Sequence, residues 1–417
     1  MKIAIIGTGI SGLATAYMLA PYHDITVFEG NDYLGGHSRT INVKVSDKKE
    51  FPVDTGFIVF NKRNYPNLTK LFDHLKVKYE KSDMSFGVSI DNGWLEYSSK
   101  SLFAQKQNFF RISFLKMLKD ILYFNHKATK LIQSYPNDTV ENFINRMSLG
   151  RWFNEYYLSA MGGCIWSTSI SEVKRFPAKM LIQFFDNHGL LTVNNHPQWY
   201  TVSGGSKEYV KKISDSYQKT ILVNTPISQV KRFNEHVCLI DSFGNSHQFD
   251  KVIMACHPDE ALNLIKEPDN KESDILGCFT YQNNHIYVHR DKKFMPKIQS
   301  TWASWTYLAN KKTNSNSPVS LTYWMNNLQN IDKKFPIFIS LNPTISPEPQ
   351  YTYHKHTFRH PLLNSKALEA QEKINMLQGH RNCWYVGAYQ RYGFHEDGLL
   401  SAINVVRSMK IDIPWLN

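Results

Sequence analysis

The fold is decided by residues 2–40, which read KIAIIGTGISGLATAYMLAPYHDITVFEGNDYLGGHSRT. The run Lys2–Ile6 is apolar and rich in isoleucine, as is typical of a parallel strand buried on both faces. After a glycine-rich turn, the small and apolar residues of Ile10–Leu19 predict a helix, and Asp24–Phe28 predicts the next strand. The chain therefore opens with a strand–helix–strand unit of about 30 residues.

The turn between the first strand and the helix has the glycine spacing of a dinucleotide-binding loop. Gly7 permits the tight turn, Gly9 lets a pyrophosphate approach the backbone, and Gly12 lets the helix pack closely on the strand. The N-terminus of the helix, at Ile10 and Ser11, attracts the anion. Glu29 ends the second strand, where its carboxylate can accept hydrogen bonds from both ribose hydroxyls and would repel a 2′-phosphate.

A second glycine pair follows this acid within the segment 35–40, GGHSRT, and brings an arginine cation toward the pyrophosphate. The spacing closely resembles the N-terminal signature of FAD-dependent oxidoreductases of the amine oxidase and phytoene desaturase superfamily. The resemblance implies that the flavin diphosphate is held by Gly35, Gly36, Arg39 and Thr40. It continues at Asp54, Thr55 and Gly56, where the superfamily brings the chain near the ribityl and the flavin ring. A simple turn acid is the alternative for Asp54.

Two later segments extend the resemblance. Residues 385–388 and 393–402 are similar to the closing strand, loop and helix of the superfamily, whose N-terminal amides stabilise negative charge on a reduced flavin. This similarity places Gly387, Gly398 and Leu399 near the cofactor. The superfamily commonly has an acid where this chain has Ala388, so that contact must come from another residue. The segments 227–230 and 250–258 also match the superfamily. This match implies that the backbone of Val230 contacts the adenine.

The matching segments predict an α/β protein with a Rossmann-type FAD-binding domain built from discontinuous segments. We assign residues 1–75, 201–262 and 381–417 to this domain. An α+β substrate domain is expected as two insertions, 76–200, which has a helical pattern, and 263–380, which has a strand pattern. With 417 residues, of which 42% are apolar, the chain can bury two cores.

A narrower resemblance suggests the reaction. Residues 199–206 and 393–399 resemble a bacterial branch of flavoproteins associated with cyclopropane-fatty-acid-synthase-like methyltransferases, one type of which is implicated in desaturating methylated acyl chains during furan fatty acid formation. We therefore expect an FAD-dependent oxidoreductase, specifically a desaturase removing hydride from an apolar acyl or phospholipid substrate, with a lipid methyltransferase as a partner. The alternatives are a flavin amine oxidase using oxygen and a non-catalytic flavin-binding partner of the methyltransferase.

His395 is the leading candidate for a proton-handling group, since its loop should pass the flavin and its unperturbed pKa lies near neutrality. Tyr392 is a second candidate at the site, and Tyr389 and Trp166 are candidate walls of the pocket. Each of these side chains could instead belong to the core. The histidines at 354, 356 and 360 are expected at the surface, and no metal site is expected.

The net charge of +12 favours anionic partners. Within residues 100–133, seven Lys and Arg accompany Asp120 alone and alternate with aromatic and aliphatic residues, which suits either an anionic membrane surface or an ordinary amphipathic helix. No nucleic-acid recognition motif accompanies them, so nucleic acid is not expected as a partner. Five scattered cysteines and the lack of a long apolar run predict a cytoplasmic protein, peripheral on the inner face of the membrane if this segment binds lipid.

Overall fold

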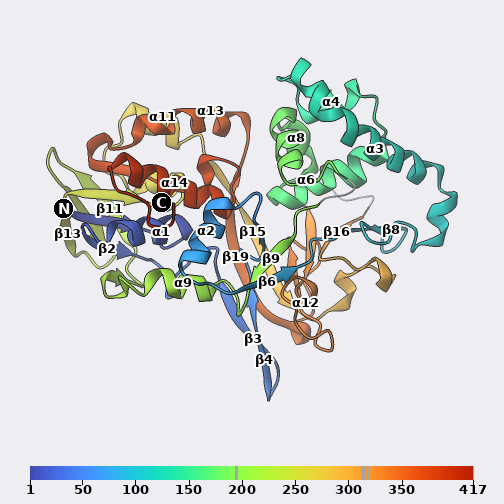
Figure 1. The fold of residues 1–417 in the computed structure, drawn as a ribbon, viewed down its shortest axis with the longest axis horizontal. Coiled ribbons are helices and arrows are strands. Elements are labelled where there is room, and N and C mark those ends of the chain that lie inside the picture. Colours follow the sequence, from blue (N-terminus) through green and yellow to red (C-terminus); the bar gives the residue numbers. More distant parts are fainter. Residues whose placement is uncertain (193–195, 311–315, 317–318, 417) are drawn as a thin grey trace.

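The computed structural model describes residues 1–192, 196–310, 316 and 319–416. Its first layer is a five-stranded parallel sheet in the order β10-β2-β1-β14-β20. These strands span Ile221–Leu222, Asp24–Phe28, Lys2–Ile6, Lys251–Met254 and Cys383–Tyr385. All three segments assigned from the sequence to the dinucleotide domain therefore meet in one sheet, at the left of Figure 1.

The two faces of this sheet are buried in separate cores, because successive side chains of a strand point to opposite sides. Ile3 and Ile5 of β1 face a core built with four helices, and Ala4 and Ile6 face the other core. The first set of helices is α1 (Ile10–Leu19), α2 (Pro66–His74), α9 (Lys207–Ser214) and α14 (His395–Ser408). The continuous apolar run of β1 follows from this double burial.

The second face is covered by a small antiparallel sheet and three helices. They are β11 (Ile227–Arg232), β12 (Val237–Asp241), β13 (Ser246–Phe249), α10 (Pro258–Leu264), α11 (Asn270–Leu276) and α13 (Ser365–Lys373). The strands β11 and β12 pair antiparallel as a hairpin around residue 234. Two of the helices, α11 and α13, come from the 263–380 segment, so part of that segment packs on the dinucleotide sheet.

A seven-stranded mixed sheet in the order β19-β15-β18-β17-β16-β7-β8 forms the second domain. Its strands span Thr352–Leu362, Thr280–His289, Phe338–Leu341, Ser320–Trp324, Trp305–Ala309, Phe86–Ile90 and Leu95–Ser98. Both inserted segments contribute strands, and β7 joins them by pairing in parallel with β16. The sheet carries β-branched and aromatic residues at its buried positions, as half-buried strands require.

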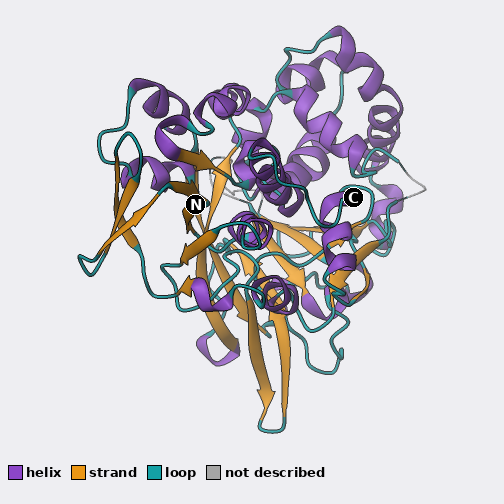
Figure 2. Ribbon diagram, turned by 60° about the vertical axis from the view of Figure 1, so that its left-hand side comes forward, coloured by secondary structure: helices purple, strands orange, loops and turns teal. Residues whose placement is uncertain are grey.

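Helices cover this sheet on one side, at the right of Figure 1 and the upper right of Figure 2. They are α3 (Ile112–Leu131), α4 (Val140–Arg146), α5 (Arg151–Phe153), α6 (Ser159–Trp166), α7 (Ile170–Arg175) and α8 (Ala178–Asn187), with α12 (Met325–Leu328) beside β17. A hairpin of β3 (Thr40–Ser46) and β4 (Lys49–Asp54) projects from the molecule, and β5 (Phe60–Asn61), β9 (Trp199–Val202) and β6 (Tyr79–Ser82) pair between the two domains. In the described chain we find no helix whose length and apolar content would let it span a membrane.

Candidate active site

The glycine loop after β1 leaves an open cradle in its middle. Gly7 has φ +106°, and a Cβ at Gly12 would lie 2.0 Å from the Gly7 carbonyl oxygen, so both glycines are required by the backbone and its packing. A Cβ built on Gly9 meets no atom within 4 Å, although Gly9 lines the large cavity described below. The fold itself has no steric need for glycine at this position, which indicates that the space belongs to a ligand.

Glu29 lies beside this cradle at the end of β2. It is 7% exposed, and its Oε2 accepts hydrogen bonds from the amide and hydroxyl of Thr8. Its Oε1 accepts from the amide of Asn31 at 2.9 Å and from the Asn31 side chain at 2.7 Å. These four bonds hold the carboxylate at the cavity wall, at the end of the second strand, where dinucleotide-binding folds place an acid against the ribose.

The second glycine pair closes the cradle from the other side. Gly36, with φ +56°, would place a Cβ 3.3 Å from the Gly9 Cα, and Gly35 donates from its amide to the Thr8 carbonyl at 3.0 Å. The Arg39 guanidinium lies 5.3 Å from the Tyr33 ring centroid, and its Nη1 is buried without a hydrogen-bond partner among the described residues. Arg39 is half-buried and lies outside the described lining of the cavity, three residues after Gly36. A cation with one unpaired buried nitrogen close in sequence to an open glycine cradle fits a diphosphate.

Several residues predicted at the cofactor have other contacts in the structure. Asp54 is buried, and its carboxylate accepts hydrogen bonds from Thr40, from the amide and hydroxyl of Ser206, and from Gln329 at 2.6–2.9 Å. Burial raises its pKa to about 6 although these bonds lower it. Asp54, Thr40 and Thr55 are absent from the described lining of the cavity, where Gly56 takes part. Asp54 therefore joins three distant segments rather than facing the cavity.

Val230 is also placed away from the cavity. It is fully buried in the core below the sheet, and its carbonyl accepts a hydrogen bond from the Lys266 amide at 2.9 Å. Ile227, three residues earlier, lines the cavity with Thr225 and Pro226. The start of β11 at Ile227, and not Val230, therefore lies at the cavity wall.

The closing segment, residues 385–402, also has some predicted residues at the cavity and others away from it. Gly387 lines the cavity, where a Cβ would lie 2.3 Å from the Tyr389 ring. Gly398 and Leu399 lie behind the wall, and a Cβ at Gly398 would come within 2.9 Å of both Ile10 and Ser11. Gly398 therefore lets α14 pack against the start of α1, which itself lines the cavity. This packing directs the N-termini of both helices to one site.

One cavity of about 900 Å³ runs from the dinucleotide loops into the second domain. Its far end is lined by apolar and aromatic side chains from α6, α8, the seven-stranded sheet and adjoining loops. They include Met84, Phe86, Met161, Ile165, Phe184, Leu190, Trp305 and Tyr323. The charged residues of the described lining are Glu29, Glu260 and Arg359, and the last two form an ion pair of 2.7 Å. The far end therefore has no charged wall among the described residues.

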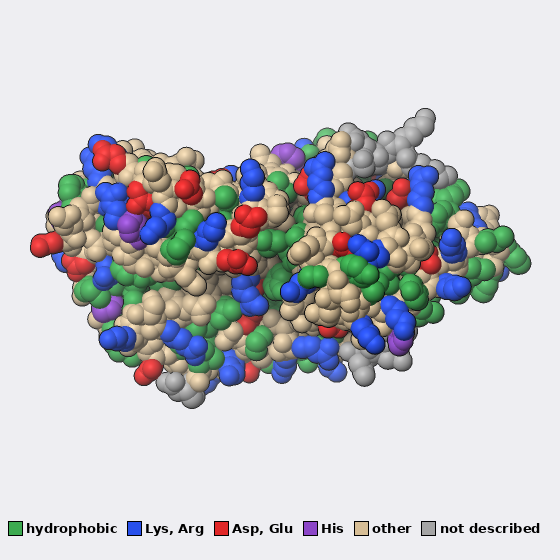
Figure 3. All heavy atoms as spheres, turned by 90° about the horizontal axis from the view of Figure 1, so that it is seen from above, with side chains coloured by type: hydrophobic (Ala, Val, Ile, Leu, Met, Phe, Trp, Pro, Cys, Tyr) green, Lys and Arg blue, Asp and Glu red, His purple; other side chains and the backbone are tan. Residues whose placement is uncertain are grey.

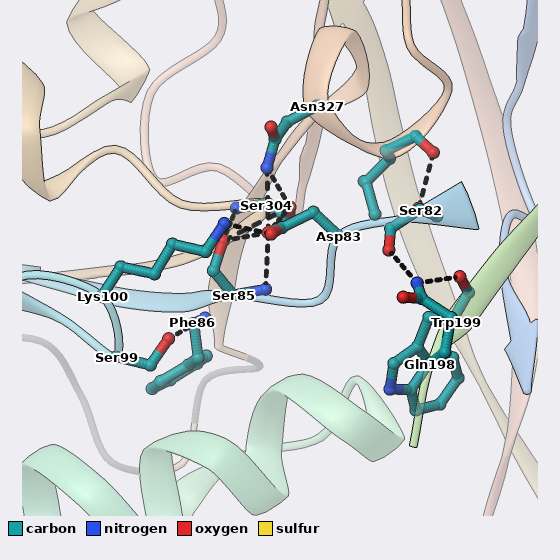
Figure 4. A network of polar contacts seen from close by, with 11 residues as sticks. Ser82, Asp83, Ser85, Phe86, Ser99, Lys100, Gln198, Trp199, Ser304 and Asn327 are labelled. Atoms are coloured by element: carbon teal, nitrogen blue, oxygen red, sulfur yellow. Dashed lines mark hydrogen bonds and ion pairs between the residues drawn. The ribbon is translucent and has the colours of Figure 1, made fainter. Parts of the chain in front are cut away.

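A half-buried polar network fixes the loop that carries two of these apolar residues (Figure 4). Asp83 accepts hydrogen bonds from Ser85, Ser304 and Asn327, and pairs with Lys100. Burial would raise the pKa of Asp83, but the bonds from these groups bring it down to about 2. The network holds the start of β7 so that Met84 and Phe86, on either side of Ser85, reach the cavity.

His395, at the start of α14, lines the cavity and lies at the junction of two distant segments. Its Nε2 is 2.8 Å from the Ser38 hydroxyl and 2.7 Å from the Tyr209 hydroxyl, and its ring stacks on Phe57 at 3.8 Å between centroids. Burial lowers its pKa from the unperturbed value to about 3, so the ring is neutral at pH 7. No sequence pattern marks Tyr209 as a site residue, while Ser38 lies within the segment 35–40 that resembles the superfamily signature.

The remaining predicted wall residues do line the cavity. Tyr392 packs edge-on to Phe184 at 5.9 Å, and Trp166 is 6% exposed with its indole nitrogen unpaired among the described residues. Tyr389 completes the wall near Gly387. The histidines at 356 and 360 also line the cavity, and burial lowers the pKa of each to about 4, so the expectation that they are surface residues is wrong.

Comparison with known proteins agrees with this geometry. The family model described as flavin-containing amine oxidoreductase matches residues 10–334. The chain belongs to this family. Its cofactor is therefore FAD and its activity that of a flavin-dependent oxidoreductase. A comparison with curated proteins gives no match.

The fold is shared with solved structures over almost the whole chain. A CLA-producing fatty acid isomerase from P. acnes is 15% identical with a TM-score of 0.68, and the match covers 98% of each chain. Cyclohexylamine oxidase from Brevibacterium oxydans IH-35A is 14% identical with a TM-score of 0.66, over 98% of this chain and 99% of that one. Reduced UDP-galactopyranose mutase is 16% identical with a TM-score of 0.67, over 98% and 95%.

FAD, when bound, supplies a two-electron acceptor for the family's redox chemistry. The residues that would hold it are the cradle at Gly9 and Gly36, the carboxylate of Glu29 for the ribose, and Arg39, whose unpaired Nη1 suits the diphosphate. The paired helix N-termini of α1 and α14 add positive potential to the same site. The second domain contributes apolar and aromatic side chains to the far end of the same cavity.

Proposed function

We propose that the protein is an FAD-dependent desaturase whose substrate is the acyl chain of a lipid. The observation that carries this proposal is the cavity, whose far end is lined by apolar and aromatic side chains and is continuous with the dinucleotide cradle. An acyl chain is recognised by burying methylene groups, each of which contributes about 0.8 kcal/mol. The apolar end can provide this without polar partners.

The same lining disfavours the amine oxidase alternative. An amine substrate brings an ammonium group, and an ammonium buried without a counter-charge is costly. The described lining has acids only at Glu29, which is held by Thr8 and Asn31, and at Glu260, which is paired with Arg359. An amine oxidase would also be expected to hold a water near the flavin with a lysine. The described lining of the cavity contains no lysine.

Desaturation removes a hydride from one carbon and a proton from its neighbour, and the remaining electron pair forms the double bond. FAD is the hydride acceptor in this proposal. Within the chain, the neutral His395 ring has a hydrogen-bonded path to the hydroxyls of Ser38 and Tyr209, along which a proton can be held or moved. The narrower resemblance at residues 199–206 and 393–399 supports a methylated acyl chain, and both of these segments border this network.

The fatty acid isomerase with the same fold supports the proposal in a general way. Its name states that it acts on a fatty acid, so this arrangement of domains accommodates an acyl chain in at least one protein. At 15% identity the likeness shows the fold alone. The substrate proposed for this chain therefore depends on the cavity and on the sequence motifs.

The proposal is tested by anaerobic reduction of the purified holoprotein. Detergent-dispersed phospholipids with methylated acyl chains should bleach the visible flavin absorption, and mass spectrometry should show the loss of two hydrogens from the acyl chain. A panel of amines should not bleach it, and oxygen should not yield peroxide with them. Bleaching by an amine would establish the oxidase alternative, and reduction by neither class would favour the non-catalytic alternative.

Two variants sharpen the test. Ile165→Asp places a carboxylate at the apolar end of the cavity and should abolish lipid-driven bleaching while FAD remains bound. Leu222→Asp adds the same charge at a side chain that is 38% exposed on the edge strand β10, so its bleaching rate should match that of the wild type. Equal rates in both variants would contradict the assignment of the apolar end to the substrate.

A further inference from the structure

An exposed apolar surface lies at the beginning of α3, far from the dinucleotide sheet (Figure 1). Among the described residues, fifteen large apolar side chains are exposed, and six of them fall between residues 109 and 123. Phe110 and Ile112 are 88% and 82% exposed. Figure 3 shows hydrophobic side chains gathered at the right-hand end of the molecule, with Lys and Arg beside them. Such a concentration marks an interaction surface rather than scattered exposure.

The helix α3 has two apolar faces with different environments. Phe114, Met117, Phe124 and Ala128 are buried in the core under the helix. Ile112, Leu115 and Leu122 are exposed, and their spacing of three and seven residues places them on one side of the helix. The buried face satisfies the needs of an ordinary amphipathic helix, so the second apolar face is left over.

Cations border the exposed apolar face. Lys116, Lys119, Lys127 and Lys130 are all exposed on α3, and Lys106 lies in the preceding turn, η1 (Lys106–Phe110). The one acid of the helix, Asp120, is already engaged, because it accepts a hydrogen bond from the Gly150 amide at 2.9 Å. The surface therefore combines exposed aromatic and aliphatic side chains with an uncompensated row of lysines.

We propose that η1 and the exposed face of α3 dock the protein on an anionic lipid bilayer. Phe110 and Ile112 would enter the boundary of the acyl chains while the lysines contact lipid phosphates, as in helices that lie in the membrane interface. The inference rests on the proposed function in one respect: a lipid substrate gives the protein a reason to dock on a membrane. Its evidence is the exposure and charge of this surface, which is separate from the cavity.

Vesicle binding of the holoprotein tests the proposal. The protein should sediment with vesicles of phosphatidylcholine and phosphatidylglycerol, should bind vesicles of phosphatidylcholine alone less, and should be released by salt. The double variant Lys116→Glu with Lys119→Glu should lower the partition coefficient about tenfold or more. The double variant Phe110→Ser with Ile112→Ser should weaken binding even at low salt, since it removes the apolar contact.

Matched controls use exposed residues elsewhere. Lys271→Glu with Lys366→Glu makes the same charge change on α11 and α13, and Phe243→Ser removes a side chain that is 71% exposed in the β12–β13 hairpin. Both controls should bind vesicles like the wild type. Equal binding by the α3 variants and the wild type would overturn the proposal. The proposal would also be overturned if the wild type were a dimer that does not bind vesicles and Phe110→Ser with Ile112→Ser made it a monomer. The surface would then be an interface between copies of the chain.

Docking and substrate use fail separately in these experiments. With detergent-dispersed lipid, the α3 variants should bleach at the wild-type rate, and with lipid in vesicles they should bleach more slowly. Vesicle binding without any reduction by lipid would leave the docking surface in place and refute the proposed substrate. Flavin reduction by dispersed lipid without vesicle binding would support the proposed substrate and refute the docking surface.

Discussion

Replacing Gly9 by alanine separates what the fold requires from what the cofactor requires. Gly9 caps the N-terminus of α1 with φ −61° and ψ 174°, which alanine adopts freely, and its added Cβ would meet no protein atom within 4 Å. Alanine is a poorer cap by about 0.5–1 kcal/mol, but it lowers the entropy of the unfolded chain by a similar amount, about 0.4–1 kcal/mol. The free energy of unfolding of the apoprotein should therefore change by less than about 0.5 kcal/mol.

FAD binding should respond differently to this change. The new methyl group would occupy the cradle and push the diphosphate away from the amides of the loop. Loss of one hydrogen bond to a charged group costs about 1.5–3 kcal/mol, which raises the Kd for FAD about tenfold to hundredfold. Quenching of flavin fluorescence on titration of the apoprotein gives this Kd, and thermal unfolding without FAD gives the stability.

Gly244→Ala is the matched control for Gly9→Ala. Gly244 also has no atom within 4 Å of a built Cβ, but its φ is +88° and it lies in the β12–β13 hairpin. Alanine there should cost about 1–2 kcal/mol of stability and leave the Kd for FAD unchanged. Wild-type affinity in Gly9→Ala would refute the cradle, and a loss of more than about 2 kcal/mol in its apoprotein would show that the fold needs this glycine.

Two further changes test the network around the site, and a third tests a buried histidine of β15, His289, whose Nε2 lies 2.8 Å from the Ser340 hydroxyl. Asp54→Asn should lower the free energy of unfolding by about 1–3 kcal/mol, since the new amide cannot accept every hydrogen bond from Ser206 and its neighbours. If the free energy of FAD binding changed by as much, Asp54 would have to contact the cofactor. Tyr209→Phe removes one of two hydroxyls at His395 and should slow lipid-driven bleaching about tenfold with FAD affinity unchanged, and an unaltered rate would exclude this path for the proton. Burial lowers the pKa of His289 to about 3, so on acidification this residue takes up a proton in the unfolded chain first. The free energy of unfolding should therefore fall below about pH 6.5, by up to about 1.4 kcal/mol per pH unit. His289→Gln should make this slope shallower in denaturant unfolding between about pH 4 and pH 6.5, and an unchanged slope would contradict the buried neutral ring.

The sequence by itself determined the local parts of the dinucleotide site. The continuous apolar run, the glycine spacing and the helical pattern predict a strand, a tight turn and a helix within residues 2–40, because those features depend on backbone sterics and on neighbours a few residues away. The structure has β1, α1 and β2 at the residues predicted for them. The family resemblance predicted that three distant segments build one dinucleotide-binding domain, and in the structure all three contribute strands to one sheet.

Only the tertiary structure decided which side chains reach the cavity. Val230 and Ile227 belong to the same strand, yet only Ile227 faces the site, because the pairing of β11 and its packing set which residues are turned away. His395 meets Ser38 across 357 residues of chain, and the pKa of its ring is lowered by burial that no local pattern records. Side-chain environment is a property of segments distant in sequence, so spacing can nominate a residue but packing determines its protonation and its neighbours.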